Sequence, residues 1–98
     1  MPGVVLIDVR NPGEVELGTI PGSRPISLPA LLMNLDDLDR NAPTIVFCAG
    51  GYRSAIASSL LRSHGFTDVS DLVGGYTAWA AHRQLFAPTV RGLASFRP

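Results

Sequence analysis

Residues 44–55, Thr-Ile-Val-Phe-Cys-Ala-Gly-Gly-Tyr-Arg-Ser-Ala, hold the pattern that decides how this chain folds. The apolar, partly β-branched run from Thr44 to Phe47 predicts a buried strand. The only cysteine, Cys48, comes next, and two glycines and Arg53 then lead into a helical pattern. A strand-to-helix turn of this kind directs backbone N–H groups and the positive end of a helix at Cys48. The turn therefore predicts a site for a reactive sulfur or for an anion.

Length and composition restrict the class of protein. A chain of 98 residues suits one domain with a modest core. The formal net charge is zero, which gives no electrostatic argument for binding nucleic acid or an anionic membrane. All eight basic residues are arginines, so a lysine nucleophile is excluded. One cysteine forms no internal disulfide, and we find neither a long apolar span nor a signal-peptide pattern. We therefore expect a soluble, cytoplasmic protein.

Apolar runs and helical spacings alternate along the chain. Continuous apolar runs predict strands at residues 4–7, 24–28, 44–48 and 69–73, the second at a sheet edge because it contains Pro25. Helices are predicted after them, from the N-cap Asn11 to just before Gly18 and at residues 29–38, 55–63 and 76–83. This alternation predicts an α/β fold, with a parallel sheet and helices on both faces. We expect residues 1–85 to form the domain and residues 86–98 a tail.

Two strand ends carry the candidate chemistry. Asp8 and Cys48 both stand at carboxyl ends of strands, where ligands bind in open α/β sheets. A helix that starts just after Cys48 favours its thiolate, so the thiol pKa of roughly 8.5 should fall. Gly50 and Gly51 let the backbone approach the sulfur closely, and Arg53 offers a positive charge to an anionic substrate. The sequence has no cluster of His, Cys and carboxylate residues, so we expect no metal and no cofactor.

Four ordered motifs resemble the rhodanese-like sulfurtransferases. They cover about 80 of the 98 residues, from Val4 to Arg83. The motifs are the strand end and helix start from Leu6 to Glu14, the turn from Gly18 to Ser23, the loop from Cys48 to Arg53, and the closing segment from Gly65 to Trp79.

The resemblance implies a fold, a reaction and a set of site residues. The fold is a three-layer α/β/α domain around a parallel sheet of four to five strands. The reaction moves sulfane sulfur from a donor, such as thiosulfate or a low-molecular-weight persulfide, through a persulfide on Cys48 to a thiophilic acceptor, which includes a protein acceptor. Ala49, Gly50, Gly51, Tyr52 and Arg53 would bind the donor, and Asp8, Arg10 and Ser54 would support the loop.

Two other functions stay open. Phosphatases and arsenate reductases of the related cell-cycle phosphatase type have a loop one residue longer, and the four residues between Cys48 and Arg53 argue against them. The second is a non-catalytic docking or regulatory module, which the retained cysteine, glycine pair and arginine disfavour.

The sequence departs from the family pattern at two places. Thr19 stands where the family usually has histidine, and the family's first strand and helix are missing before Val4. Since that strand lies beside the equivalent of residues 69–73, its absence predicts an uncovered sheet edge. We expect the tail to cover this edge, within the chain or in a second copy that makes a homodimer.

Deletion of residues 86–98 tests this expectation. Loss of the covering segment should expose the edge and reduce solubility, measured by sedimentation and size-exclusion chromatography. Unchanged solubility of a monomeric truncated protein would contradict it.

Overall fold

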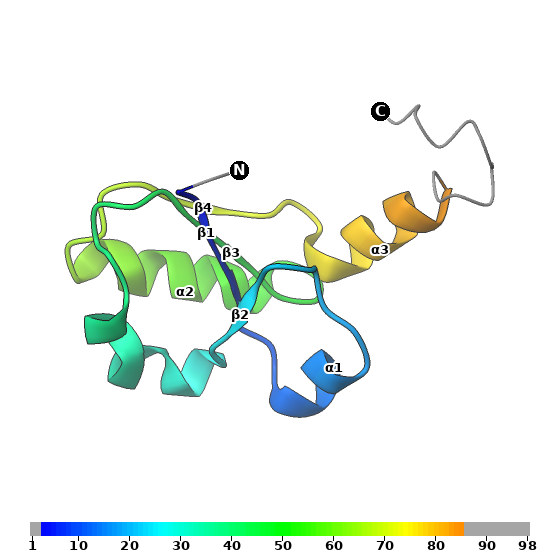
Figure 1. The fold of residues 1–98 in the computed structure, drawn as a ribbon, viewed down its shortest axis with the longest axis horizontal. Coiled ribbons are helices and arrows are strands. Elements are labelled where there is room, and N and C mark those ends of the chain that lie inside the picture. The colour runs from blue at the N-terminus through cyan, green and yellow to red at the C-terminus, as the bar shows by residue number, and fades with distance from the viewer. Residues whose placement is uncertain (1–2, 86–98) are drawn as a thin grey trace.

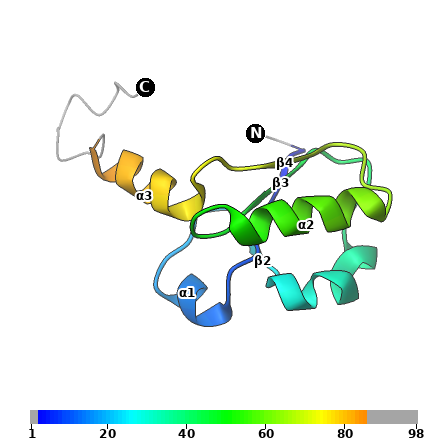
Figure 2. The same cartoon turned by 180° about the vertical axis from the view of Figure 1, so that it is seen from behind.

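The computed structural model describes residues 3–85, and they form one parallel sheet with four helical elements (Figures 1 and 2). The sheet has the order β2-β1-β3-β4. Its strands are β1 (Val5–Asp8), β2 (Arg24–Pro25), β3 (Thr44–Phe47) and β4 (Val69–Asp71), and every neighbouring pair is parallel. The predicted α/β fold with a central parallel sheet is confirmed.

The register of the two central strands brings the predicted site residues to one edge of the sheet. Asp8 of β1 is paired with Phe47 of β3, directly before Cys48. The N–H of Val9 donates to the carbonyl of Phe47 at 3.0 Å, so pairing continues to the ends of both strands. The prediction that Asp8 and Cys48 converge at the carboxyl ends of their strands is therefore confirmed.

One hydrophobic core lies between the sheet and two helical elements, η1 (Leu28–Asp37) and α2 (Tyr52–Ser63). Ile7 and Val46 are partners in adjacent strands and both are fully buried. They belong to the same cluster as Leu31 of η1 and Leu61 of α2. Helix α2 contacts β3, β4 and η1, which fixes the two helical elements against the same part of the sheet.

The helix predicted at residues 29–38 forms as a 3₁₀ helix, displaced by one residue. The side-chain amide of Asn34 donates to the backbone carbonyl of Ala30, four residues earlier, at 2.8 Å. In an α-helix that carbonyl accepts the N–H of residue 34, so the Asn34 side chain competes with α-helical geometry. Leu31 and Leu35 still point into the core, whereas Leu32, which shares the leucine-rich pattern, is half exposed.

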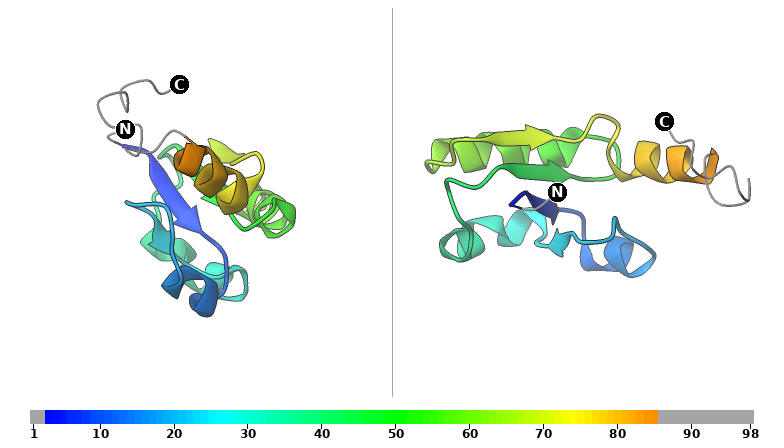
Figure 3. Two further views of the ribbon diagram at one scale, coloured as in Figure 1. Left: turned by 90° about the vertical axis from the view of Figure 1, so that its right-hand side faces the viewer. Right: turned by 45° about the horizontal axis from the view of Figure 1, so that its top comes forward.

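The two remaining helices, α1 (Pro12–Glu16) and α3 (Gly75–Leu85), lie beyond the carboxyl ends of the strands (Figure 3). Helix α1 begins as predicted: Asn11 is the N-cap, and its N–H donates to the Glu14 carboxylate at 3.0 Å. Both helices therefore border the edge of the sheet that carries Cys48.

Several predicted boundaries move when tertiary contacts are present. The strands predicted at 24–28 and 69–73 are shorter in the structure, while the helices predicted at 55–63 and 76–83 start earlier. Pro25 lies on an edge strand, as predicted, and Gly65 follows the C-cap of α2, His64, with a φ of 90°. Strand β4 is at the other edge and pairs only with β3 among the described residues.

The predicted tail lies outside those residues, and no described helix is long and apolar enough to cross a membrane.

Candidate active site

The loop between β3 and α2 surrounds the Cys48 sulfur with hydrogen-bond donors. The backbone N–H of Gly51 donates to Sγ at 3.1 Å, and that of Ser54 donates at 3.3 Å. The Ser54 hydroxyl lies 3.6 Å from the sulfur. Gly51 is the N-cap of α2 and has a φ of 124°, a conformation that a side chain disfavours. The predicted strand-to-helix turn thus directs its amides at the sulfur.

These donors decide the ionisation of Cys48. The residue is only 1% exposed, and burial by itself raises the pKa of the thiol. The hydrogen bond between Sγ and the Ser54 hydroxyl and those from the backbone amides of Ser54, Gly51 and Arg53 outweigh burial, so the net effect is a lowered pKa of Cys48. The thiolate of Cys48 is therefore more favoured than that of an ordinary cysteine, as the sequence predicts.

The carbonyl groups of the same loop are held by the start of α3. The N–H of Tyr76 donates to the carbonyl of Cys48 at 2.7 Å, and that of Thr77 donates to the carbonyl of Ala49 at 3.1 Å. Gly75 makes this approach possible, because a Cβ there would lie within 2.3 Å of the Cys48 oxygen. These two hydrogen bonds hold the Cys48 end of the loop against the start of α3.

A buried ion pair fixes the end of β1 beside the loop. Arg10 donates from Nε and Nη2 to the carboxylate of Asp8, and both residues are buried. Burial raises the pKa of Asp8, but hydrogen bonds from Arg10 and Thr19 outweigh it and leave this pKa lowered. The Thr19 hydroxyl donates to Asp8 at 2.6 Å, so threonine supplies a donor where the family usually has histidine.

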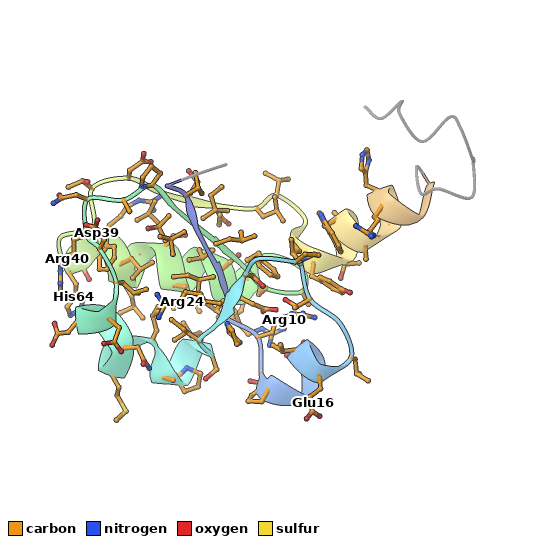
Figure 4. The ribbon with its side chains drawn as sticks, in the orientation of Figure 1. Arg10, Glu16, Arg24, Asp39, Arg40 and His64 are labelled. Atoms are coloured by element: carbon orange, nitrogen blue, oxygen red, sulfur yellow. The ribbon has the colours of Figure 1, made fainter. Side chains whose placement is uncertain are left out.

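Arg10 also connects this pair to α3. Its Nη2 donates to the carbonyl of Gly18 at 2.6 Å, and its guanidinium lies 4.2 Å from the ring centroid of Tyr76. Figure 4 places Arg10 between the strands and α1. Tyr76 is the residue whose N–H holds the Cys48 carbonyl. Asp8 and Arg10 thus lie next to the loop and reach it through α3, while their supporting role stays a prediction.

Arg53 is bound to a carboxylate from a different part of the chain. Its Nη1 and Nη2 donate to the two oxygens of Glu14 at 2.6 and 3.0 Å. The hydrogen bond from Arg53 is the main reason why the pKa of Glu14 falls to about 2. Glu14 also accepts the N–H of Asn11 in a capping arrangement at the start of α1, whereas Arg10 is paired with Asp8.

The other predicted binding residues lie on the outer side of the loop. Gly50 and Tyr52 are exposed, Tyr52 by 80%, and Ala49 is half-buried. A pocket of about 360 Å³ lies farther along, between α1, β2 and η1, and is lined in part by Arg10 and Val15. None of residues 48–53 lines that pocket, and the candidate site is identified by the hydrogen bonds at Cys48. Among residues 3–85, no group of three or more His, Cys, Asp or Glu side chains is placed to hold a metal ion.

Comparison with known proteins assigns the fold and its motifs to a family. The rhodanese-like domain model matches residues 1–82. The chain belongs to the rhodanese-like family. Among solved structures, the Rhodanese_3-like domain of the Alr3790 protein from Anabaena sp. is similar, with a TM-score of 0.75 and 33% identity over 80% of this chain and 91% of that one.

Named relatives in this family differ in activity. A thiosulfate sulfurtransferase GlpE from Pseudoalteromonas translucida is 37% identical over 78 residues, which cover 80% of this chain and 74% of that protein. A tRNA uridine(34) hydroxylase from Acaryochloris marina is 39% identical over 84 residues, covering 80% of this chain and 27% of that protein. A sulfurtransferase-like role is therefore supported, within a rhodanese-like family whose members are varied.

Two features of the site were not anticipated from the sequence. The partner of Arg53 is 39 residues away, and the only local signal for Glu14 is its capping position. The second is the close contact between Gly75 and the Cys48 carbonyl, which any side chain at position 75 would prevent. A pair of consecutive glycines before a helix was the available signal for this close approach.

Substitution of Gly75 by alanine should destabilise the protein. The new Cβ would collide with the carbonyls of Cys48 and Ala49, and the φ of 60° disfavours a side chain. We expect a loss of about 2–5 kcal/mol in the free energy of unfolding, measured by urea denaturation. Gly50→Ala is the control, because a Cβ at Gly50 meets open space. Equal losses in the two variants would contradict the contact with α3.

Substitution of Ser54 by alanine should raise the pKa of Cys48. The variant removes the hydroxyl that favours the thiolate but keeps the Ser54 backbone donor. The pKa is measured from the pH dependence of thiolate absorbance or of alkylation by iodoacetamide, with Ser59→Ala on the exposed side of α2 as the control. An unchanged or lower pKa in the Ser54 variant would rule out this contribution.

Proposed function

We propose that this protein is a sulfurtransferase that moves sulfane sulfur from thiosulfate or a low-molecular-weight persulfide to a thiophilic acceptor through a persulfide on Cys48. The observation that carries the proposal is the pair of backbone amides, from Gly51 and Ser54, that donate to Sγ. Amides in a fixed loop stabilise a negative charge on the sulfur without reorganising during the reaction.

The first step forms the persulfide. The Cys48 thiolate attacks the outer sulfur of thiosulfate and a new sulfur–sulfur bond forms. The bond to the sulfonate sulfur breaks, and its electron pair leaves with sulfite. Because Cys48 is 1% exposed, a donor that presents one narrow terminal sulfur suits this position better than a bulky electrophile.

The second step returns the enzyme to its starting state. A thiolate acceptor, from a small molecule or a protein, attacks the outer sulfur of the persulfide and takes it over. The sulfur–sulfur bond to Cys48 breaks and its electron pair returns to Sγ. The amides of Gly51 and Ser54 then stabilise Sγ as a leaving group, so the same two donors serve both half-reactions.

The loop geometry supports sulfur chemistry over phosphoryl chemistry. The amides that an oxyanion of phosphate would need converge on the sulfur atom, at 3.1 and 3.3 Å. The bidentate fork of Arg53, which a phosphate ester would need, is bound to Glu14. We therefore place phosphatase or arsenate reductase activity below sulfur transfer.

Two further parts of the proposal concern the protein's surroundings. A cytoplasmic location suits the mechanism, since Cys48 has to return to a free thiol after every cycle. The edge of β4, which pairs only with β3 among the described residues, is a proposed contact for residues 86–98 or for a second copy of the chain.

Mass spectrometry of the intact protein tests the central claim. After incubation with thiosulfate or glutathione persulfide, we expect a mass increase of one sulfur atom on Cys48, which a thiol acceptor then removes. Cys48→Ser is the control and should gain no mass. Absence of the adduct with every sulfane donor would refute the proposal and favour the docking or regulatory function.

A further inference from the structure

The Arg53 guanidinium, the cation nearest to the sulfur along the loop, is already occupied. Its two terminal nitrogens form a bidentate pair with Glu14, at 2.6 and 3.0 Å. Glu14 is itself fixed, because one of its oxygens also accepts the N–H of Asn11 at the start of α1. The side chains of Arg53 and Glu14 are 29% and 34% exposed, so this pair lies within reach of a solute.

The charges around the site do not favour a dianion. Arg10, the other arginine beside the loop, is bound to Asp8 and to the carbonyl of Gly18. A donor that approaches the Cys48 thiolate meets one positive group, Arg53, and one negative group, Glu14, in contact with it. These three groups sum to one negative charge, so binding the anionic end of a donor to Arg53 requires competition with a carboxylate.

We propose that Glu14 determines the donor specificity of this site: it competes with the anionic end of the sulfur donor for Arg53 and so disfavours dianionic donors relative to donors of lower charge. This inference rests on the proposed sulfur transfer through Cys48. The substrate class that it selects is sulfane donors with a single charge or none on the group beside the transferred sulfur, such as organic thiosulfonates and alkyl persulfides.

Two small sulfur donors differ in net charge but transfer sulfur by the same reaction. Thiosulfate is a dianion, and methanethiosulfonate replaces one of its charged oxygens by a methyl group and is a monoanion. Both present a terminal sulfur to the Cys48 thiolate. In each case one sulfur–sulfur bond forms and one breaks, and the electron pair leaves with sulfite or with methanesulfinate.

The test measures kcat/KM for both donors in Glu14→Gln. Glutamine keeps the size of the side chain and an oxygen for the N–H of Asn11, but it removes the charge. The Coulomb energy between Glu14 and the donor scales with the charge of the donor, so it is twice as large for the dianion. The factor by which kcat/KM rises in Glu14→Gln should therefore be, for the dianion, the square of the factor for the monoanion. We expect an increase of about tenfold for thiosulfate and about threefold for methanethiosulfonate.

Glu16→Gln is the matched control. Glu16 belongs to the same short helix and carries the same charge, but its side chain points away from the body of the domain (Figure 4). It is exposed, and the salt bridges found among residues 3–85 do not include it. This variant changes the net charge of the protein by the same amount and should leave the ratio of the two donors unchanged.

The Arg53→Gln background shows whether Glu14 acts through Arg53. If the two anions compete for that guanidinium, the gain from Glu14→Gln should be smaller once Arg53 is removed, because only the direct repulsion between Glu14 and the donor is then left to relieve. Equal gains for the two donors, or a full gain without Arg53, would overturn the proposal.

The wild-type protein provides a measurement that needs no variant. Because the three charged groups sum to one negative charge, salt should screen a repulsion and raise kcat/KM for thiosulfate more than for methanethiosulfonate. A decrease for thiosulfate would mean that Arg53 attracts it freely, against the proposal. If the wild-type protein forms the persulfide but shows no such difference between the donors, only the role of Glu14 is refuted. If neither donor gives a persulfide, the proposed function is refuted as well.

Discussion

The site depends on how the peptide groups of one loop are oriented. Each peptide group has a donor at one end and an acceptor at the other, and a buried loop has to satisfy both. Here the carbonyls of Cys48 and Ala49 accept from the first amides of α3, while the N–H groups of Gly51 and Ser54, at the start of α2, donate to the sulfur. The position of the Cys48 sulfur among its donors thus depends on where both α2 and α3 begin.

A buried polar cluster holds α3 in place. Arg10 is in contact with the Asp8 carboxylate, the Gly18 carbonyl and the ring of Tyr76, so it joins β1, the turn after α1 and the start of α3. Burying such an ion pair does little for net stability, because desolvation offsets the attraction. Its value here is geometric, since it fixes three segments around the end of β3.

The sequence predicted the features that depend on local pattern. Continuous apolar runs located β1 and β3, and the glycines after Cys48 indicated a close backbone approach that Gly51 makes with a φ of 124°. Contacts between residues far apart in the sequence could not be predicted from any local pattern of residues. The pairing of Arg53 with Glu14 spans 39 positions, and the 3₁₀ form of η1 depends on which donor reaches the Ala30 carbonyl. Roles in binding therefore had to come from the family resemblance and stay proposals.

The pair Gly74 and Gly75 has a consequence for how the protein can vary. A Cβ at Gly74 would lie 2.6 Å from the Cβ of Ala78, and one at Gly75 would strike the Cys48 carbonyl. The connection from β4 to α3 looks like a surface turn, where insertions are ordinarily tolerated. An added residue there would shift the first amides of α3 away from the loop and leave the carbonyls of Cys48 and Ala49 without donors. The spacing of this connection is therefore expected to be invariant among active homologues, although it contributes no side chain to the chemistry.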